Sequence, residues 1–311
     1  MKKLDFTTTL NETQSYVGEQ AGQYVLAAFL QNKTADTGLR IETDIIKSKF
    51  VAKLTGSSLV KGGSGTSGNC TFTASGTIVA GEVELTPKPM WINIELCYED
   101  LEALWSGLNS GDLNARGLTD DFNGALQAVL IDAMNQAFED AIWNGSYDAT
   151  GITTNSLFNG IEAQITTHAI TSGATFSKTN IVGFVDQLVE SLPAVVIENK
   201  ESLKIYMNPK SALYYRQAMM ALGYSIVGDG ATNTLSTYDG IQIEEIVKIE
   251  TDSMYAFDPQ NVAIGVGAMD NFAQVSILDM REHNLDNSLR MALQGKATVG
   301  VIYESECAKF V

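Results

Sequence analysis

Residues 46–68 read IKSKFVAKLTGSSLVKGGSGTSG, and this stretch decides the fold more than any other. Over Ile46–Leu54 the odd-numbered positions hold three lysines and a valine. The even-numbered positions from 48 onward hold a serine, Phe50, Ala52 and Leu54. Alternation with a period of two is typical of a β-strand, and here it predicts a strand with one basic face. The remainder is rich in glycine and serine, which makes it flexible and costly to order.

Alternation resumes over Val83–Leu85 and again over Ile92–Leu96. Together with the first strand it predicts a long hairpin over residues 46–90 with a loose tip. A hairpin this polar is difficult to bury inside its own domain. We therefore expect it to project from the body and to be completed by a second copy of the chain.

The strongest helix prediction covers residues 119–144, TDDFNGALQAVLIDAMNQAFEDAIWN. Thr119 is suited to cap the first turn, and two aspartates follow it at the positive end of the helix dipole. Apolar residues from Phe122 to Ala141 keep to one face, and Gly145 stands where a left-handed cap is expected. A helix of this length extends roughly 39 Å, which suits a spine along a flat domain.

The rest of the chain predicts an α+β fold. Residues 1–45 are mostly polar with one apolar patch at Tyr24–Leu30, which suggests a surface-lying arm with one short helix. Beyond residue 175 helices and strands alternate. We predict helices over 177–192 and 208–222, and strands over 203–207, 241–249, 262–266, 272–277 and 296–310.

The composition narrows the function classes. The 311 residues include 20 bases and 37 acids, a net charge of −17, which disfavours specific nucleic-acid binding. No apolar run is long enough to span a membrane, and no signal peptide is recognisable. Cys70, Cys97 and Cys307 form no paired motif, so we expect no disulfide framework and no zinc site. Cys97 and Cys307 lie in apolar strands and are predicted to be core residues.

The chemistry-bearing residues predict no catalytic, cofactor or metal site. His168 and His283 lack the spacing of metal ligands, and the glycine-rich stretch is followed by no phosphate-loop lysine. The acids of the long helix are expected to form a solvated face, since no histidine accompanies them.

The order of these parts resembles the major capsid proteins of tailed bacteriophages, the Hong Kong 97-type fold. Four segments are also loosely similar to segments of that family in their local sequence: Val83–Trp91, Tyr238–Ile243, Met254–Gly265 and Ala292–Val311. The resemblance implies an N-terminal arm, an extended E-loop hairpin, a peripheral domain with a long spine helix, an axial domain and a return strand. The expected bounds are 1–45 for the arm, 46–90 for the E-loop, 91–174 for the peripheral domain with its spine at 119–144, 175–284 for the axial domain and 285–311 for the return.

The function that this resemblance implies is a capsid subunit that forms hexamers and pentamers of an icosahedral head around double-stranded DNA, which it contacts non-specifically. The expected location is the virion, assembled in the host cytoplasm. Expected partners are further copies of the chain, a separate scaffolding protein, a portal and decoration proteins. Two alternatives remain, an encapsulin-like nanocompartment shell and a cytosolic α+β enzyme.

The distribution of charge suggests how two subunits could contact each other. Between Glu95 and Asp148 there are eleven acids and one base, whereas the hairpin carries lysines. We expect the basic hairpin of one subunit to dock on the acidic spine of the next, because complementary charge selects the correct partner face. The residues predicted at this contact are Lys47, Lys49, Lys53, Lys61, Asp120, Asp121, Asp132, Glu139 and Asp140.

Overall fold

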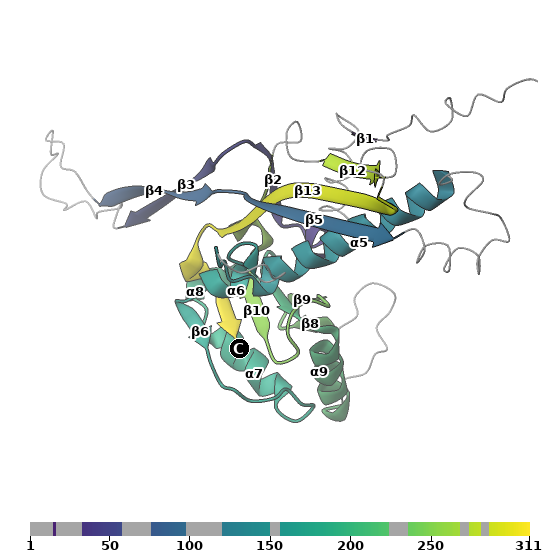
Figure 1. Cartoon of the computed structure of the whole chain (residues 1–311). Coiled ribbons are helices and arrows are strands. Elements are labelled where there is room, and N and C mark those ends of the chain that lie inside the picture. Colours follow the sequence, from purple (N-terminus) through teal and green to yellow (C-terminus); the bar gives the residue numbers. More distant parts are fainter. Residues whose placement is uncertain are drawn as a thin grey trace, which may run out of the picture.

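A computed structural model describes residues 15–16, 33–57, 76–97, 120–149, 156–223, 236–267, 274–280 and 286–311. These residues form two six-stranded sheets, a separate two-stranded ribbon and several helices. Figure 1 shows the ribbon extending to one side of the body, with the first sheet and the long helix α5 above the second sheet and its helices. The predicted α+β class is confirmed.

The first sheet is organised around its long strand β13. It has the order β1-β12-β13-β11-β2, and β5 pairs with β13 as well. All pairs are antiparallel except β11 with β2. The bounds are β1 Ser15–Tyr16, β2 Arg40–Ile45, β5 Lys88–Cys97, β11 Val262–Gly267, β12 Gln274–Asp279 and β13 Ser288–Val301.

Strand β2 differs from the expectation that residues 1–45 form a surface arm. It adds to the edge of the first sheet parallel to β11, and Ile45 at its end is buried. The preceding segment contains a four-residue helix, α2 (Lys33–Asp36), and Thr34, Thr37 and Leu39 are buried. Residues 24–30, the predicted apolar patch of the arm, lie outside the described residues.

Helix α5 (Asp120–Asn144) matches the predicted helix over 119–144 within one residue. Leu130 and Met134 pack in the same core cluster as β13 and β5. At its last turn Trp143 lies on the aromatic rings of Tyr206 and Tyr255, with ring centroids 5.2 and 5.5 Å away. The helix therefore joins the two sheets through one continuous core.

The second sheet has the order β6-β14-β10-β7-β9-β8. Alternation with a period of two divides its strands between two cores: Tyr206 and Tyr255 face Trp143, while Ile205, Met207 and Met254 face the helices α7 and α9. The bounds are β6 His168–Ile170, β7 Lys204–Met207, β8 Thr237–Tyr238, β9 Ile241–Glu245, β10 Met254–Phe257, β14 Ala308–Phe310, α6 Ile161–Gln164, α7 Ile181–Glu190, α8 Ala194–Glu198 and α9 Pro209–Ala221.

After β6 has joined the second sheet, the chain returns to the first sheet at one short 3-10 helix, η4 (Pro259–Asn261), and goes back to the second at another, η5 (Glu304–Glu306). As a result β11 and β12 belong to the first sheet although they fall inside the expected axial range 175–284, and β14 belongs to the second although it falls inside 285–311. The period of a strand is the same in either sheet, so periodicity could not place these crossings.

Two predicted boundaries are wrong for local reasons. Ser177 was expected to cap a helix, but a turn follows it and α7 begins only at Ile181, after Asn180. Strand β9 ends at Glu245, four residues before the predicted end, because its partner β7 ends at Met207 and a turn follows at residues 247–248.

Candidate interaction surface

The ribbon consists of β3 (Lys49–Ser57) and β4 (Thr77–Leu85), paired antiparallel from Lys49 opposite Leu85 to Ser57 opposite Thr77. The predicted hairpin is therefore present, and its tip, 58–75, lies outside the described residues. Directly opposite residues share a face of a two-stranded sheet. The register defines a basic face with Lys49, Val51, Lys53, Thr55, Ser57, Thr77, Val79, Gly81, Val83 and Leu85, and an acidic face with Phe50, Ala52, Leu54, Gly56, Ile78, Ala80, Glu82 and Glu84.

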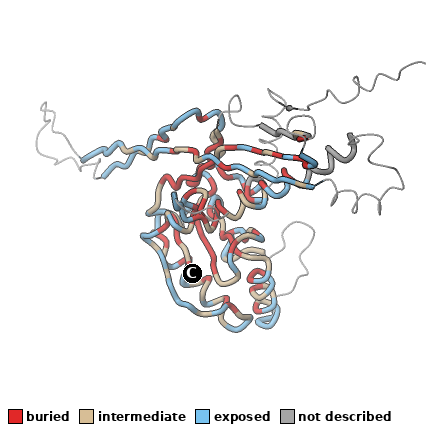
Figure 2. The backbone as a smooth tube through the Cα atoms, in the orientation of Figure 1, coloured by how far each residue is buried: buried red, intermediate tan, exposed pale blue. Residues whose placement is uncertain are grey.

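The basic face is anchored to the body at its base. Val51 and Leu85 are buried with Ile45, Ala263 and Ile302. Farther out, the backbone N–H of Leu54 donates to the hydroxyl of Tyr303 over 3.2 Å. The inner end of the ribbon is thus folded onto its own chain, and only the outer part projects, as Figure 2 shows by the change from red to pale blue along it.

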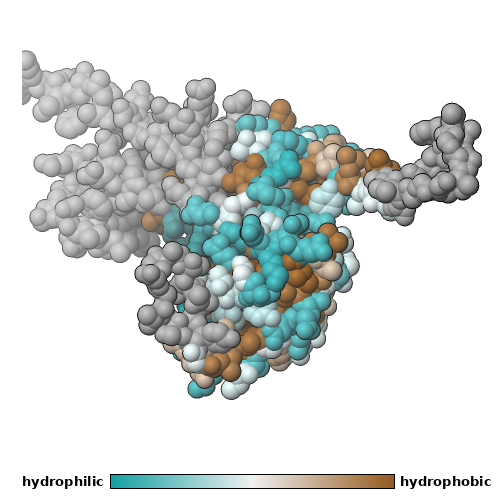
Figure 3. All heavy atoms as spheres, turned by 180° about the vertical axis from the view of Figure 1, so that it is seen from behind, coloured by the Kyte–Doolittle hydropathy of each residue, from teal (hydrophilic) through white to brown (hydrophobic). Residues whose placement is uncertain are grey.

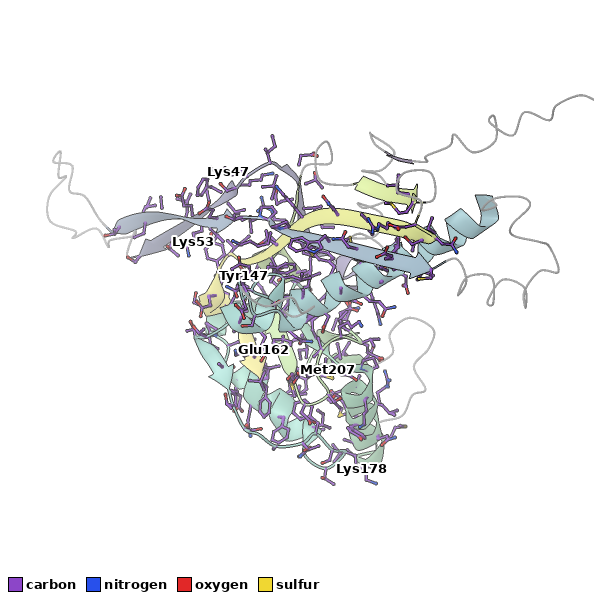
Figure 4. All side chains as sticks on the ribbon, in the orientation of Figure 1. Lys47, Lys53, Tyr147, Glu162, Lys178 and Met207 are labelled. Atoms are coloured by element: carbon purple, nitrogen blue, oxygen red, sulfur yellow. The ribbon has the colours of Figure 1, made fainter. Side chains whose placement is uncertain are left out.

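The predicted contact lysines differ in their surroundings. Lys49 pairs with Glu42 of β2, and this hydrogen bond, helped by Arg40, holds the pKa of Glu42 below its usual value. Lys53 lies along the ribbon with its side chain over Gly81, where an added Cβ would be 3.0 Å from the Lys53 Cε. Lys47 is exposed in the bend just before β3, and Lys53 lies on the ribbon (Figure 4). Lys61 lies outside the described residues.

The acidic face is exposed over its whole length. Phe50, Leu54 and Ile78 have 55, 65 and 66% of their surface accessible. A contiguous patch of exposed large apolar side chains is typical of an interaction site, whereas apolar residues exposed singly are common on any surface. Figure 3 shows such brown surface on the ribbon beside its grey tip.

The sequence interpretation missed the acidic face. It recognised the lysine parity in β3 but not that Glu82 and Glu84 alternate with valine and leucine on the returning strand. That alternation was the available signal, since a hairpin register would have set both glutamates opposite the apolar parity of β3.

The acids predicted on the spine are also unequal. Asp132 accepts a hydrogen bond from Gln136 and Asp140 from Asn144, and the spacing of four residues places Asp132, Gln136 and Asp140 on one row of α5. Glu139 instead accepts from the backbone N–H and the hydroxyl of Thr34, so it holds α2 on the helix. The side chains of Asp120 and Asp121 lie outside the described residues.

Within the described part of the chain no ion pair joins the ribbon lysines to these acids. The ribbon projects to the opposite side from the free end of α5 (Figure 1), so the two sets are separated in one chain. A contact between them requires two chains.

Other candidate chemistry is sparse in the described ranges. They hold no group of three or more histidine, cysteine or acidic side chains placed to bind a metal ion. No helix among them is long and apolar enough to cross a membrane. Cys307 is buried, as predicted, but Cys97 is exposed, because its strand has only one face on the core. His168 lies half-buried in β6.

Comparison with solved structures finds capsids along nearly the whole chain. The satellite phage P4 procapsid that includes the size determination (Sid) protein has a TM-score of 0.60 at 11% identity, over 93% of this chain and 89% of that chain. The capsid of a native GTA particle has 0.58 at 13% identity, over 91% and 89%. The capsid of cyanophage A-1(L) has 0.57 at 14% identity, over 89% and 92%.

The chain has the Hong Kong 97-type capsid fold. No family model and no curated protein matches the sequence. The similarity to capsid proteins therefore lies in the backbone fold. At 11–14% identity it does not assign a contact role to any individual residue.

Proposed function

We propose that this protein is the major capsid protein of a tailed double-stranded DNA bacteriophage, a structural subunit that assembles into hexamers and pentamers of an icosahedral head. The observation that carries the proposal is the projecting ribbon, which is anchored along its inner part and exposes one complete face. The capsid fold of the chain supports the same conclusion.

In this proposal the ribbon is the E-loop, and residues before β2 form the N-terminal arm. The first sheet with α5 is the peripheral domain, because α5 lies along it as a spine. The second sheet with α7 and α9 is the axial domain. In this proposal the axial domain ends at η4 instead of at 284, and the end of the chain returns to it after η5 as strand β14.

The docking of one subunit's ribbon on the next subunit's spine follows from charge. Lys47, just before the ribbon, and Lys53, on it, form no ion pair with the described residues. Asp132 and Asp140 lie on one row of α5. An exposed ion pair contributes only ~0.2–1 kcal/mol. Repetition over a closed shell multiplies this contribution, and complementary charge also selects the register of the contact.

The remaining partners follow from the same role. A separate scaffolding protein, a portal and decoration proteins are proposed as partners, as the resemblance to phage capsid proteins implies. The net charge of −17 suits an inner wall that contacts packaged DNA without binding it tightly. The proposed location is the virion, after assembly in the host cytoplasm.

Electron microscopy and sedimentation of the purified protein test the proposal. We expect closed particles of megadalton mass, and a population that stays monomeric at every concentration and with added crowding agent would contradict it. Reversing both ribbon lysines (Lys47→Glu with Lys53→Glu) should abolish closed shells while the subunit keeps its circular dichroism.

The matched control is Lys178→Glu with Lys210→Glu, which changes the net charge by the same amount. Lys178 lies at the far end of the molecule from Lys47 and Lys53 (Figure 4). Shells from the control but not from the ribbon variant would support a contact at the ribbon. Loss of shells in both would point to total charge instead.

A further inference from the structure

We propose that the acidic face of one ribbon receives the outer part of the basic face of a ribbon from a second copy, so that neighbouring ribbons stack on each other. This inference rests on the proposed function, since it names a second partner for the ribbon in the assembled shell. The ribbon has two faces of different chemistry. In the stack Lys53 meets a neighbouring ribbon in place of the spine acids, and Lys47, which lies before β3, is left for the spine.

The two faces are segregated by charge. Among the described residues, the acidic face holds Glu82 and Glu84 and no base, whereas the basic face holds Lys49 and Lys53 and no acid. The lysines share their face with aliphatic side chains, and the glutamates share theirs with Phe50, Leu54 and Ile78. The two faces are therefore complementary in charge, and both offer apolar surface to bury.

The shapes of the faces also fit. On the acidic face each large aliphatic side chain stands opposite a small residue, Leu54 opposite Ala80 and Ile78 opposite Gly56. On the basic face Lys53 lies flat over Gly81, which has no side chain to lift it. Shallow hollows on one face and a flat surface on the other allow two sheets to approach to the usual spacing of about 10 Å.

Burial decides which part of the basic face is available. Its inner end, at Val51 and Leu85, is covered by the chain's own body. Its outer end, with Lys53, Thr55 and Val79, is not, and Val79 is exposed. The stack therefore joins the outer end of one basic face to the acidic face of the next ribbon and sets Lys53 near Glu82. Because the two contacting faces are different, the contact is heterologous and leaves the first ribbon's own acidic face open for a further copy.

A charge-swap series distinguishes this contact from the ribbon–spine contact. Lys53→Glu alone should abolish or greatly reduce closed shells. Adding Glu82→Lys to this variant should restore the shells, because the new glutamate at position 53 of one copy then faces the new lysine at position 82 of another copy. Adding Asp132→Lys instead should not restore them.

Rescue by Asp132→Lys and not by Glu82→Lys would overturn the stacking while leaving the capsid function in place. Normal shells from Lys53→Glu alone would also overturn it. Absence of shells from the unaltered protein would instead contradict the proposed function. Lys178→Glu serves as the single-charge control and should assemble normally.

A disulfide test gives an independent readout. Thr55→Cys and Ala80→Cys place one thiol on each face of the ribbon, so the two thiols of one chain point away from each other. Oxidation of assembled particles should give a covalent ladder of chains on a non-reducing gel. The unaltered protein and the Thr55→Cys variant, treated alike, control for the native cysteines. Assembled double-variant particles without any ladder beyond these controls would contradict the stacking.

Discussion

Asn261 bonds both polar atoms of its side chain to the backbone of Tyr303. Its Oδ1 accepts from the Tyr303 N–H over 2.6 Å, and its Nδ2 donates to the Tyr303 carbonyl over 2.8 Å. Its backbone carbonyl also accepts from the N–H of Ile302 over 2.9 Å. Asn261 ends η4 and Tyr303 precedes η5, so one buried amide links the two crossings at which the chain leaves the second sheet and later returns to it.

Removing that amide should loosen both crossings at once. Asn261→Ala leaves the N–H of Tyr303 without this acceptor, whereas the Tyr303 carbonyl still accepts from the N–H of Glu306 over 3.1 Å. We therefore expect a loss of about 1–3 kcal/mol in the free energy of unfolding, the cost of one unsatisfied group. Urea denaturation of the unassembled subunit measures it. Gln260→Ala, next to it on the exposed side, is the control and should cost much less. Equal losses in the two variants would contradict the role of Asn261.

A pair of glycines makes a second test of packing. The N–H of Gly160 donates to the carbonyl of Gly145 over 2.7 Å where α5 ends. A Cβ at position 160 would lie 2.6 Å from the Ala141 carbonyl oxygen and 2.7 Å from the Gly145 nitrogen, both backbone atoms. Gly160→Ala should therefore destabilise the fold by about 1–3 kcal/mol, as overpacking does.

The control for that substitution is Gly183→Ala in α7. This glycine is exposed and a Cβ there meets nothing within 4 Å, so the change should stabilise by about 0.5–1 kcal/mol through helix propensity. Thermal melts of both variants measure the opposite signs. A Gly160→Ala variant as stable as Gly183→Ala would show that the two backbones are not in contact.

These particular residues show how far sequence patterns reach. Helix α5 was predictable because its apolar face is a local signal. The left-handed cap expected at Gly145 is wrong: its φ is not positive, and a glycine fits there because a Cβ would lie 2.4 Å from the carbonyl oxygens of Ala141 and Phe158. The signals of α9 are local too, since Asn208 caps the first turn by accepting from the Lys210 N–H and Gly223 takes a positive φ. Both helices carry their signals within or beside their own residues.

The features that the sequence did not predict depend on contacts between distant parts of the chain. Strand β2 reads RIETDI, with a single buried residue, and it exists because β11, more than two hundred residues later, supplies its hydrogen bonds. The acidic face of the ribbon likewise depends on the register between β3 and β4. The lysine parity could be predicted from nine residues, but the opposite face could not without the pairing.

The cysteines offer a chemical test of burial. Burial, with a smaller contribution from Glu306 and Glu304, raises the pKa of Cys307 to about 12. Because the thiolate is the reactive form, Cys307 should resist alkylation at pH 8 in the folded subunit, while exposed Cys97 reacts readily. Site-resolved mass spectrometry gives the two rates, and both should become equal in urea. Labelling of Cys307 at the rate of Cys97 without denaturant would contradict the described core.

Glu304 should make the stability of the folded subunit depend on pH. Its Oε1 accepts from the backbone N–H and hydroxyl groups of Thr166 and Thr167, which ties η5 to the start of β6. These hydrogen bonds, the Thr166 hydroxyl first, hold the pKa of Glu304 below its usual value of 4.5. A carboxyl whose pKa is lowered on folding contributes its full stability above the unfolded pKa and loses it as the pH falls through the folded pKa.

Glu304→Gln removes the charge but keeps the shape. At pH 7 it should lower the free energy of unfolding by about 1 kcal/mol, since a charge-assisted hydrogen bond is stronger than a neutral one and solvent screens part of the difference. As the pH falls below 4.5 the curves for the variant and the unaltered protein should converge, because the native carboxyl becomes neutral too. Denaturation at several pH values between 7 and 3 measures the difference. A gap that stays constant over this range would mean that the charge of Glu304 contributes nothing to the link between η5 and β6.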